Sequence, residues 1–380
     1  MINANVSAFS IGKAVGSGAK NLDPVITSSP VTTGTQGVAY SYQVQATDPE
    51  GGSLTYTLPT KPAGMTISGS GLIAWTPSSG GSESVVVRVT DNKGAFAEQS
   101  YSVAVVARPS VSYAVIAGAG SGGSNRGGGG GAGGILVSTT NVSLSVAMTL
   151  TVGGGGSAPV EGLGSNGSAS VFGSFSASGG GGGAHAASSQ GNDGGSGGGG
   201  GSGGSPPNGG SGISGQGNDG GSEASGYAAY GGGGGKGSAG QDGSSSSGGN
   251  GGNGINLNSY VGVSIDVGGG GGGGVAANLN RSSASSGGGR GGKTHSGDYH
   301  YPQDGTSRTG GGGGGGGQYV SSDTGYMKGG NGGSGVIYLK YPSSNTATFS
   351  AGVSQTTTTS GGYKTSEITA AGPSDTVTFG

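Results

Sequence analysis

Runs of glycine constrain this chain more than any other feature of its sequence. Of its 102 glycines, 84 lie between residues 111 and 342, and pure runs occupy 127–131, 153–156, 179–183, 197–201, 231–235, 268–274 and 310–317. Glycine loses more conformational freedom on folding than any other residue. These runs therefore form ordered structure only if many backbone contacts compensate for the lost entropy, and a conventional side-chain core is excluded there.

Two interpretations of the runs are open. A flexible linker is the simpler one, because Gly/Ser-rich chains behave as random coils. The other is a packed array of extended left-handed helices, in which only glycine lets neighbouring backbones approach closely enough to exchange hydrogen bonds. We favour the array, because a linker would not be interrupted by well-patterned strands. Runs 268–274 and 310–317 are then expected to be hydrogen-bonded neighbours.

Alternating apolar residues flank and interrupt the glycine runs. Segments 111–117 and 336–341 open and close the glycine-rich region, and residues 142–152 are apolar at every even position. A shorter pattern of this kind covers 261–267. Period-two alternation is typical of a half-buried strand. We therefore expect a glycine array with β edges at 111–342, followed by a small C-terminal β segment at 343–380.

Residues 24–107 carry the pattern of a different domain. Alternation recurs in several short runs, separated by turn sequences such as those at 48–52 and 91–94. Many short strands in a segment of this length are typical of a β-sandwich. Trp75, the only tryptophan, is expected in the core of this sandwich. Residues 1–22 are predicted to be an arm that attaches to other subunits.

This N-terminal segment resembles a known family. The stretches ATDPEGGSLTYTL, PAGMTISGSGLIAWTP and VVVRVTDNKGAFAEQSYSVAV are similar to the cadherin-related immunoglobulin-like modules of bacterial and phage surface proteins. The resemblance implies a spacer or a carbohydrate-contacting stalk. In some of these modules acidic turn residues bind calcium, which makes Asp48, Glu50 and Asp91 weak calcium candidates here. Gly51-Gly52 stands where a further acidic residue is common.

The glycine-rich region also resembles a known family. The stretches YAVIAGAGSGG, GGGGGAGGILVSTT, LTVGGGG and GGNGGSGVIYLKYP are similar to the glycine-rich domain of tailed-phage tail-fibre and receptor-binding adhesins. The resemblance implies polyglycine-II packing, with loops between the runs that contact the host. The expected fold class is therefore all-β plus polyglycine II: an Ig-like β-sandwich, then the glycine array with its β edges, and almost no α-helix.

Composition and motifs argue against several other function classes. The net charge is −2, whereas electrostatic binding of nucleic acid needs a basic face. The chain has no cysteine, which excludes thiolate metal sites and cysteine nucleophiles. Copies of GxGxxG arise from composition alone, and no helical pattern follows them. We therefore expect no enzyme activity, no catalytic residue, no cofactor and no membrane insertion, and the N-terminus lacks the pattern of a secretory signal.

Tyrosine and histidine residues between the runs are the candidate receptor-binding residues. Those that stand out are His295, Asp298, Tyr299, His300, Tyr301, Tyr319 and Tyr326. Tyrosine offers a large, rigid contact area with a polar tip at little entropic cost. The alternative is that tyrosines beside glycine runs only cover the ends of the array. A metal site at the two histidines is not expected, because such sites need three or four ligands on a rigid frame.

The position of each loop follows if successive runs alternate in direction. The insertion 255–267 and the closing strand 336–341 then share one end of the array. Insertions 236–247, 275–286 and 318–328 share the other end. The same count puts 293–309 at the same end as 255–267, although the composition of 293–309 is the most typical of a recognition loop. Both 318–328 and 293–309 stay candidates.

The sequence thus favours a phage virion structural protein, a tail fibre or an adhesin-like component, that presents its loops to a receptor. Its expected partners are other virion proteins, bound through 1–22, and a host cell-surface glycan or outer-membrane protein. It would be a homo-oligomer or part of a larger assembly, located in the virion and extracellular when acting. The alternatives are a structural fibre without a recognition role, from a head, a neck or an extracellular filament, and a bacterial surface adhesin.

Overall fold

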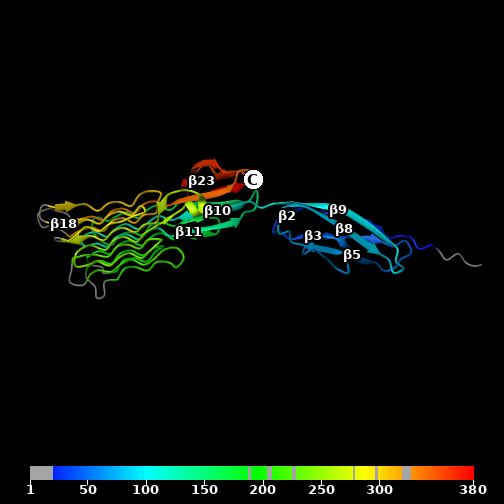
Figure 1. Cartoon of the computed structure of the whole chain (residues 1–380), viewed down its shortest axis with the longest axis horizontal. Coiled ribbons are helices and arrows are strands. Elements are labelled where there is room, and N and C mark those ends of the chain that lie inside the picture. Colours follow the sequence, from blue (N-terminus) through cyan, green and yellow to red (C-terminus); the bar gives the residue numbers. More distant parts are fainter. Residues whose placement is uncertain are drawn as a thin grey trace, which may run out of the picture. The chain divides into compact units, whose positions relative to one another are not determined.

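The computed structural model describes residues 20–186, 190–202, 208–224, 228–276, 279–295, 298–318 and 327–380 (Figure 1). The chain divides into two units, Met1–Arg108 and Pro109–Gly380. The elements in the described residues are β-strands apart from one four-residue helix, α1 (Asn258–Val261). The expectation of a nearly all-β chain is therefore confirmed. None of the described helical residues belongs to a helix long and apolar enough to cross a bilayer.

The first unit is built from two β-sheets and one short strand pair. One sheet has the order β2-β9-β8-β5, the other has the order β3-β7-β6, and β1 pairs with β4. The strands are β1 (Val25–Ile26), β2 (Thr33–Thr35), β3 (Tyr40–Gln43), β4 (Ala46–Thr47), β5 (Thr55–Thr60), β6 (Thr66–Ile67), β7 (Leu72–Trp75), β8 (Gly81–Thr90) and β9 (Phe96–Val106). Of the arm predicted at 1–22, residues 1–19 lie outside the described residues.

Period-two alternation places apolar side chains of both sheets in one core. Buried residues from β3, β7, β8 and β9 contribute to it. Trp75 is 7% exposed, and its ring meets that of Tyr40 edge-on with centroids 6.1 Å apart. The Nε1 atom of Trp75 donates to the carbonyl oxygen of Ala63 at 3.1 Å, which satisfies its buried N–H group. Trp75 is therefore a core residue, as expected.

The second unit begins with two five-stranded sheets that enclose a second core. Their orders are β11-β10-β20-β23-β22 and β14-β13-β12-β24-β21. The strands are β10 (Ser110–Ile116), β11 (Ile135–Asn141), β12 (Ala147–Thr151), β13 (Ser170–Phe172), β14 (Phe175–Ala177), β20 (Val336–Pro342), β21 (Ala347–Phe349), β22 (Ser354–Ser360), β23 (Tyr363–Ala370) and β24 (Asp375–Phe379). Tyr113, Phe172, Leu339 and Phe379 are among the buried residues of this core.

The C-terminal segment belongs to these sheets. β23 pairs with β20 from Ile337↔Ile368 to Pro342↔Tyr363, and β24 pairs with β12. The structure thus differs from the predicted boundary at residue 342, because 343–380 lies in the same unit as the glycine-rich region. The physical reason is that β12 and β20 would otherwise have open edges.

The strand pattern predicted at 142–152 is only partly realised. β12 covers Ala147–Thr151, and Leu150 is fully buried. Ser145 has a φ of 57°, a left-handed conformation that interrupts the extended chain. As a result Val146 is 53% exposed, although it continues the alternation of the sequence.

The segment 255–267 covers the second face of the sheet that contains β10 and β20. Its elements are β15 (Ile255–Asn256), α1 and β16 (Asp266–Val267). Leu257, Val261 and Val267 are buried against a cluster that includes Ile116 and Val336. Instead of the strand that alternation predicted over 261–267, the helix ends at Gly262, which has a φ of 74°. We call this end of the second unit the sheet end; 255–267 and 336–341 share it, as predicted.

From the sheet end the glycine runs extend side by side toward β18 (Lys293–His295) (Figure 1). Their backbone hydrogen bonds repeat every three residues, as the run 127–134 illustrates. Its N–H groups donate to 310–316 (from Gly127, Gly130 and Gly133), to 178–184 (from Gly128, Gly131 and Gly134) and to 231–234 (from Gly129 and Ala132). Its carbonyl oxygens accept from 117–123, 196–199 and 271–274. The run therefore has six hydrogen-bonded neighbours.

This pattern is the one that a packed array of threefold helices requires. Three residues per turn direct successive N–H groups to different neighbours and return to the first neighbour at the fourth residue. Residues 127–134 are neither α-helix nor strand, and none of them has a positive φ. The linker interpretation does not fit these runs, because their backbone groups are paired. Polyglycine-II handedness and pitch stay predictions.

Runs 268–274 and 310–317 are direct neighbours, as expected. The N–H groups of Gly312 and Gly315 donate to the carbonyl oxygens of Gly269 and Gly272, both at 2.9 Å. The residue numbers of the donors and of the acceptors increase in the same direction, so the two runs are parallel. The close approach of their backbones explains why both consist of glycine alone.

Candidate functional site

The end of the array opposite the sheet end is formed by loops that bind one another. β17 (Val275–Ala276) pairs in parallel with β18, and β18 pairs with β19 (Asp298–His300). Thr294 Oγ1 donates to the carbonyl oxygen of Gln318 at 2.8 Å. The N–H group of Gly317 donates to Met327 Sδ at 3.2 Å. We call this region, described at 228–230, 275–276, 293–295, 298–302, 317–318 and 327, the loop end.

Five of the seven predicted receptor-binding residues lie on or beside one hairpin at the loop end. β18 and β19 form this hairpin, with Thr294 opposite Tyr299 and His295 opposite Asp298. Tyr299 is 47% exposed and Tyr301, which follows the hairpin, is 75% exposed. His300 is also exposed. The two other candidates, Tyr319 and Tyr326, lie outside the described residues.

Arg281 anchors the end of the hairpin and was not predicted from the sequence. Its Nε atom donates to the carbonyl oxygen of Gly291 at 2.6 Å, and its Nη2 atom donates to that of Tyr301 at 2.7 Å. Burial lowers the pKa of Arg281, and the charge of Arg290 lowers it further, but an arginine keeps its charge in proteins. A single arginine between glycine runs gives no pattern that would have identified this role.

The structure places 293–309 differently from the prediction, which assumed that successive glycine runs alternate in direction. The N–H group of Gln303 donates to the carbonyl oxygen of Arg290 at 2.9 Å, and that of Thr306 donates to the carbonyl oxygen of Gly287 at 2.7 Å. Residues 303–306 are therefore a further run of the array, antiparallel to 287–290. The hairpin before it therefore lies at the loop end, together with Gln318. The count had put 293–309 and 318–328 at opposite ends, whereas the hairpin and the described residues Gln318 and Met327 lie at the same end.

The insertion 236–247 is divided between the two ends. Lys236 donates its N–H to Gly268 at 2.8 Å. Gly268 lies against Ile135, so residue 236 is at the sheet end and not at the loop end as predicted. Ser247 forms a bridge with Asn280, beyond β17, so the insertion reaches the loop end only near residue 247. Its intermediate residues 240–243 make run-to-run hydrogen bonds that the sequence did not reveal.

Tyr230 shows that a tyrosine at the loop end can also be structural. It is fully buried, and its N–H group donates to the carbonyl oxygen of Gly274 at 3.2 Å. Burial raises the pKa of its hydroxyl, with a smaller opposing effect of Arg126. The alternative role predicted for the tyrosines, covering the end of the array, thus fits Tyr230, whereas Tyr299 and Tyr301 are exposed.

Two family models match the chain. The model described as "Glycine-rich domain" matches residues 90–342. This chain belongs to the glycine-rich domain family. The model described as "Putative Ig domain" matches residues 23–106, so an Ig-like module precedes the glycine-rich domain, as the sequence predicted. No curated protein matches the chain.

In the Ig-like module, the calcium candidates serve as turn residues. Asp48 Oδ1 accepts the N–H groups of Glu50 and Gly52 at 2.9 and 2.8 Å. Asp91 Oδ1 accepts the N–H group of Lys93 at 2.8 Å. Burial raises the pKa of Asp91, but the hydrogen bond from Asn21 and those from backbone N–H groups outweigh it, so the pKa is lowered. Within the described ranges, no three His, Cys, Asp or Glu residues form a group that could hold a metal.

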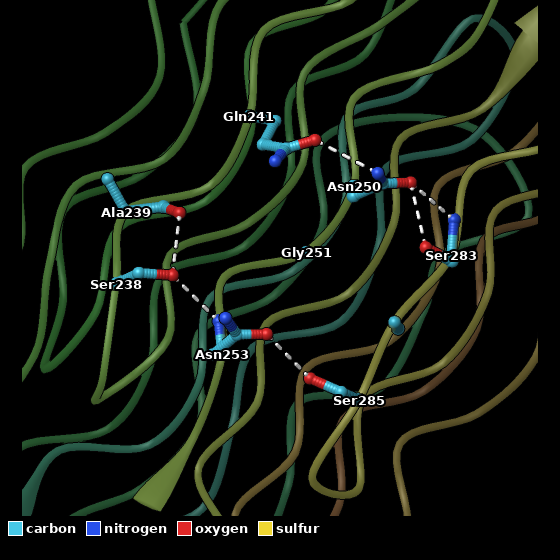
Figure 2. A pocket seen from close by; sticks show the side chains of 9 residues that line it. Ser238, Ala239, Gln241, Asn250, Gly251, Asn253, Ser283 and Ser285 are labelled. Atoms are coloured by element: carbon cyan, nitrogen blue, oxygen red, sulfur yellow. Dashed lines mark hydrogen bonds between the residues drawn. The ribbon is translucent and has the colours of Figure 1, made fainter.

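A shallow pocket of about 150 Å³ lies on the side of the glycine-rich domain. Figure 2 shows two rows of uncharged polar side chains that cross three neighbouring runs. In one row Asn250 binds Gln241 and Ser283, with distances of 2.9 Å to both side chains. In the other row the backbone N–H group of Asn253 donates to Ser238 Oγ, and Ser285 Oγ donates to Asn253 Oδ1. Because these groups satisfy one another, the rows close the lateral edge of the array.

Proposed function

We propose that this protein is a structural component of a phage virion, a tail fibre or an adhesin-like protein, whose loop end binds a receptor on the host surface. One observation carries the proposal: Tyr299, on the hairpin, and Tyr301, directly after it, are 47% and 75% exposed, and Arg281 binds the carbonyl oxygen of Tyr301. Large, exposed aromatic side chains on an anchored hairpin favour binding, because they lose little conformational entropy when a partner contacts them.

The array supports the proposal as a rigid base for such loops. Binding residues are commonly placed on loops that a rigid scaffold positions. Here the loops are connected to runs whose N–H and C=O groups are paired with neighbouring runs. The glycine-rich domain would thus hold the loop end in one geometry before a receptor arrives.

The partners in this proposal are a host cell-surface glycan or outer-membrane protein at the loop end, and other virion proteins at residues 1–22. The protein would belong to the virion and act outside the cell, without a cofactor and without catalysis. Tyrosine suits both receptor classes, because its ring packs on apolar faces, including those of sugars, and its hydroxyl forms hydrogen bonds.

Two alternatives assign the loops no receptor of this kind. In a head or neck fibre, or in an extracellular filament subunit, the exposed tyrosines would have no recognition role. In a bacterial surface adhesin they would bind, but the protein would not be part of a virion. In both alternatives these tyrosines do not attach a virion to its host, so replacing Tyr299 and Tyr301 would not change the adsorption of virions.

The test replaces Tyr299 and Tyr301 together by alanine in the virion. We expect adsorption to host cells to fall at least about tenfold, as for removal of binding hot spots, with an unchanged melting temperature of the purified protein. Tyr260→Ala is the matched control, because Tyr260 is 44% exposed but lies on α1 at the sheet end. Normal adsorption of the double variant, and of a second one at Tyr319 and Tyr326, would refute receptor binding by these loops.

A further inference from the structure

The strand β22 has an unusual surface for the edge of a sheet. It is the last strand in the order β11-β10-β20-β23-β22, and among the described strands it pairs with β23 alone. All seven of its residues, Ser354–Ser360, are exposed. An edge strand presents a row of N–H and C=O groups that a further strand can bind. β22 therefore offers a seven-residue template with both faces open.

This edge lacks the features that normally prevent pairing with another chain. Natural edges carry charges, proline or bulges. The edge strand β5 of the Ig-like module follows that rule, because it contains Pro59 and a bulge between Thr57 and Thr60. Residues 354–360 contain neither a charge nor a proline, and their single irregularity lies at the start, between Ser354 and Gln355.

The hairpin turn fixes which backbone groups of β22 point outward. Gly361 and Gly362 form a two-residue loop with φ of 56° and 80°, and Ser360 pairs with Tyr363. Residues that flank such a turn form a hydrogen-bonded pair, and such pairs recur at every second position. Residues 356, 358 and 360 thus bind β23, whereas the N–H and C=O groups of residues 355, 357 and 359 point away from the sheet.

We propose that β22 binds β22 of a second copy of this chain, antiparallel and with a two-fold axis at Thr357. In this register Thr357 faces the partner's Thr357, and Gln355 faces the partner's Thr359. All three residues with outward backbone groups then form hydrogen-bonded pairs, which no other two-fold register achieves. The sheet β11-β10-β20-β23-β22 of one copy then continues into the same sheet of the other copy.

The side chains of β22 suit this self-pairing. The sequence Ser-Gln-Thr-Thr-Thr-Thr-Ser reads nearly the same in both directions, so Thr356 faces the partner's Thr358 and Ser354 faces the partner's Ser360. Thr–Thr pairs across strands, of which this register contains three, are favourable. No like charges meet within the strand pair. One strand pair is smaller than a standard stable interface, so we expect a reversible dimer with micromolar affinity. This proposal does not depend on receptor binding at the loop end.

The experiment is sedimentation equilibrium of the full-length chain and of charged variants. The unaltered chain should approach twice its monomer mass at high micromolar concentration. In Thr356→Lys with Thr358→Lys, two pairs of like charges face each other across the axis, and we expect at least about tenfold weaker association. Thr356→Glu with Thr358→Glu should have the same effect. An equimolar mixture of the two variants should dimerise again, because each Lys then faces a Glu.

Thr55→Lys with Thr57→Lys is the matched control. Thr55 and Thr57 have the same spacing and are also exposed on an edge strand, β5, so this variant should dimerise like the unaltered chain. Thermal unfolding should show that every variant folds. The Glu pair is expected to be the least stable of the β22 variants, because Thr356 lies directly opposite Glu367 of β23 and like charges there are unfavourable. A monomer at all concentrations overturns the proposal. So does association that the Lys pair at 356 and 358 leaves intact, or a mixture of the Lys and Glu variants that stays monomeric.

Discussion

The carbonyl oxygen of Gly313 occupies the space into which a Cβ atom on Gly271 would point. Gly271 donates its own N–H group to Gly130 at 2.9 Å, on another neighbouring run. A side chain at residue 271 would therefore push apart backbones that hydrogen bonds hold together. This relationship explains in physical terms why position 271 requires glycine.

Gly271→Val should strongly destabilise the second unit. The added side chain overlaps backbone atoms that cannot move without breaking hydrogen bonds, so we expect a loss of about 3 kcal/mol or more. Thermal unfolding followed by calorimetry measures it. Gly154→Val is the matched control, because a Cβ on Gly154 has no atom within 4 Å. Equal melting temperatures of the two variants would contradict the packed array.

Asp219→Ala should weaken the lateral edge of the array. Asp219 Oδ1 accepts the N–H group of Gly212 at 2.7 Å. Its removal leaves that N–H without its acceptor, which we expect to cost about 1 kcal/mol, as for a helix cap. Urea unfolding measures the change. Asp219→Asn keeps an acceptor oxygen and should recover most of the stability; an Asn variant as unstable as the Ala variant would argue against the hydrogen bond.

Arg281→Met should loosen the hairpin of β18 and β19 without unfolding the array. Methionine keeps an apolar stem but loses the hydrogen bonds to Gly291 and Tyr301. We expect faster amide hydrogen exchange at 298–301, while exchange in 310–316 stays unchanged. The exposed Arg290 provides the control variant Arg290→Met, which should leave both regions as they are. Unchanged exchange in the Arg281 variant would mean that other contacts hold the hairpin.

Acid should destabilise the second unit through Asp375. Hydrogen bonds from the Ser350 hydroxyl and the Gly372 N–H group, both 2.7 Å long, hold the pKa of Asp375 below its ordinary value of 3.8. A carboxylate with a lowered pKa stabilises the folded state above the unfolded pKa. This contribution is lost as the pH falls through the folded pKa. The melting temperature of the second unit should therefore drop as the pH decreases below about 4.

Asp375→Asn distinguishes this carboxylate from the other acidic groups. The variant should have a lower melting temperature at neutral pH and a shallower decline below pH of about 4. Ser350→Ala removes the largest cause of the lowered pKa and should give an intermediate decline. The same acid dependence in all three proteins would assign the effect to other residues.

The sequence predicted the regular parts of this fold because their rules are local. Alternation in the Ig-like module placed Trp75 in its core, and the purity of the runs 268–274 and 310–317 required that each pack closely against other backbones. The exposed pair Tyr299 and Tyr301 was also found from the sequence, because aromatic residues stand out among glycines. In each case the residue type and its spacing are sufficient, since the constraint acts within one strand or one run.

Only the tertiary structure decided which segments complete the array and where its loops meet. In the run 303–306, Gly305 is buried against Gly311 while Gln303 and Thr306 are exposed. A threefold run at the edge of the array needs glycine only on its inward side, so this run has the composition of a loop. That hidden run brings the hairpin 293–300 to the loop end, and Arg281 to Tyr301. Sequence by itself determined that backbones must touch; which backbones touch depends on contacts between distant segments.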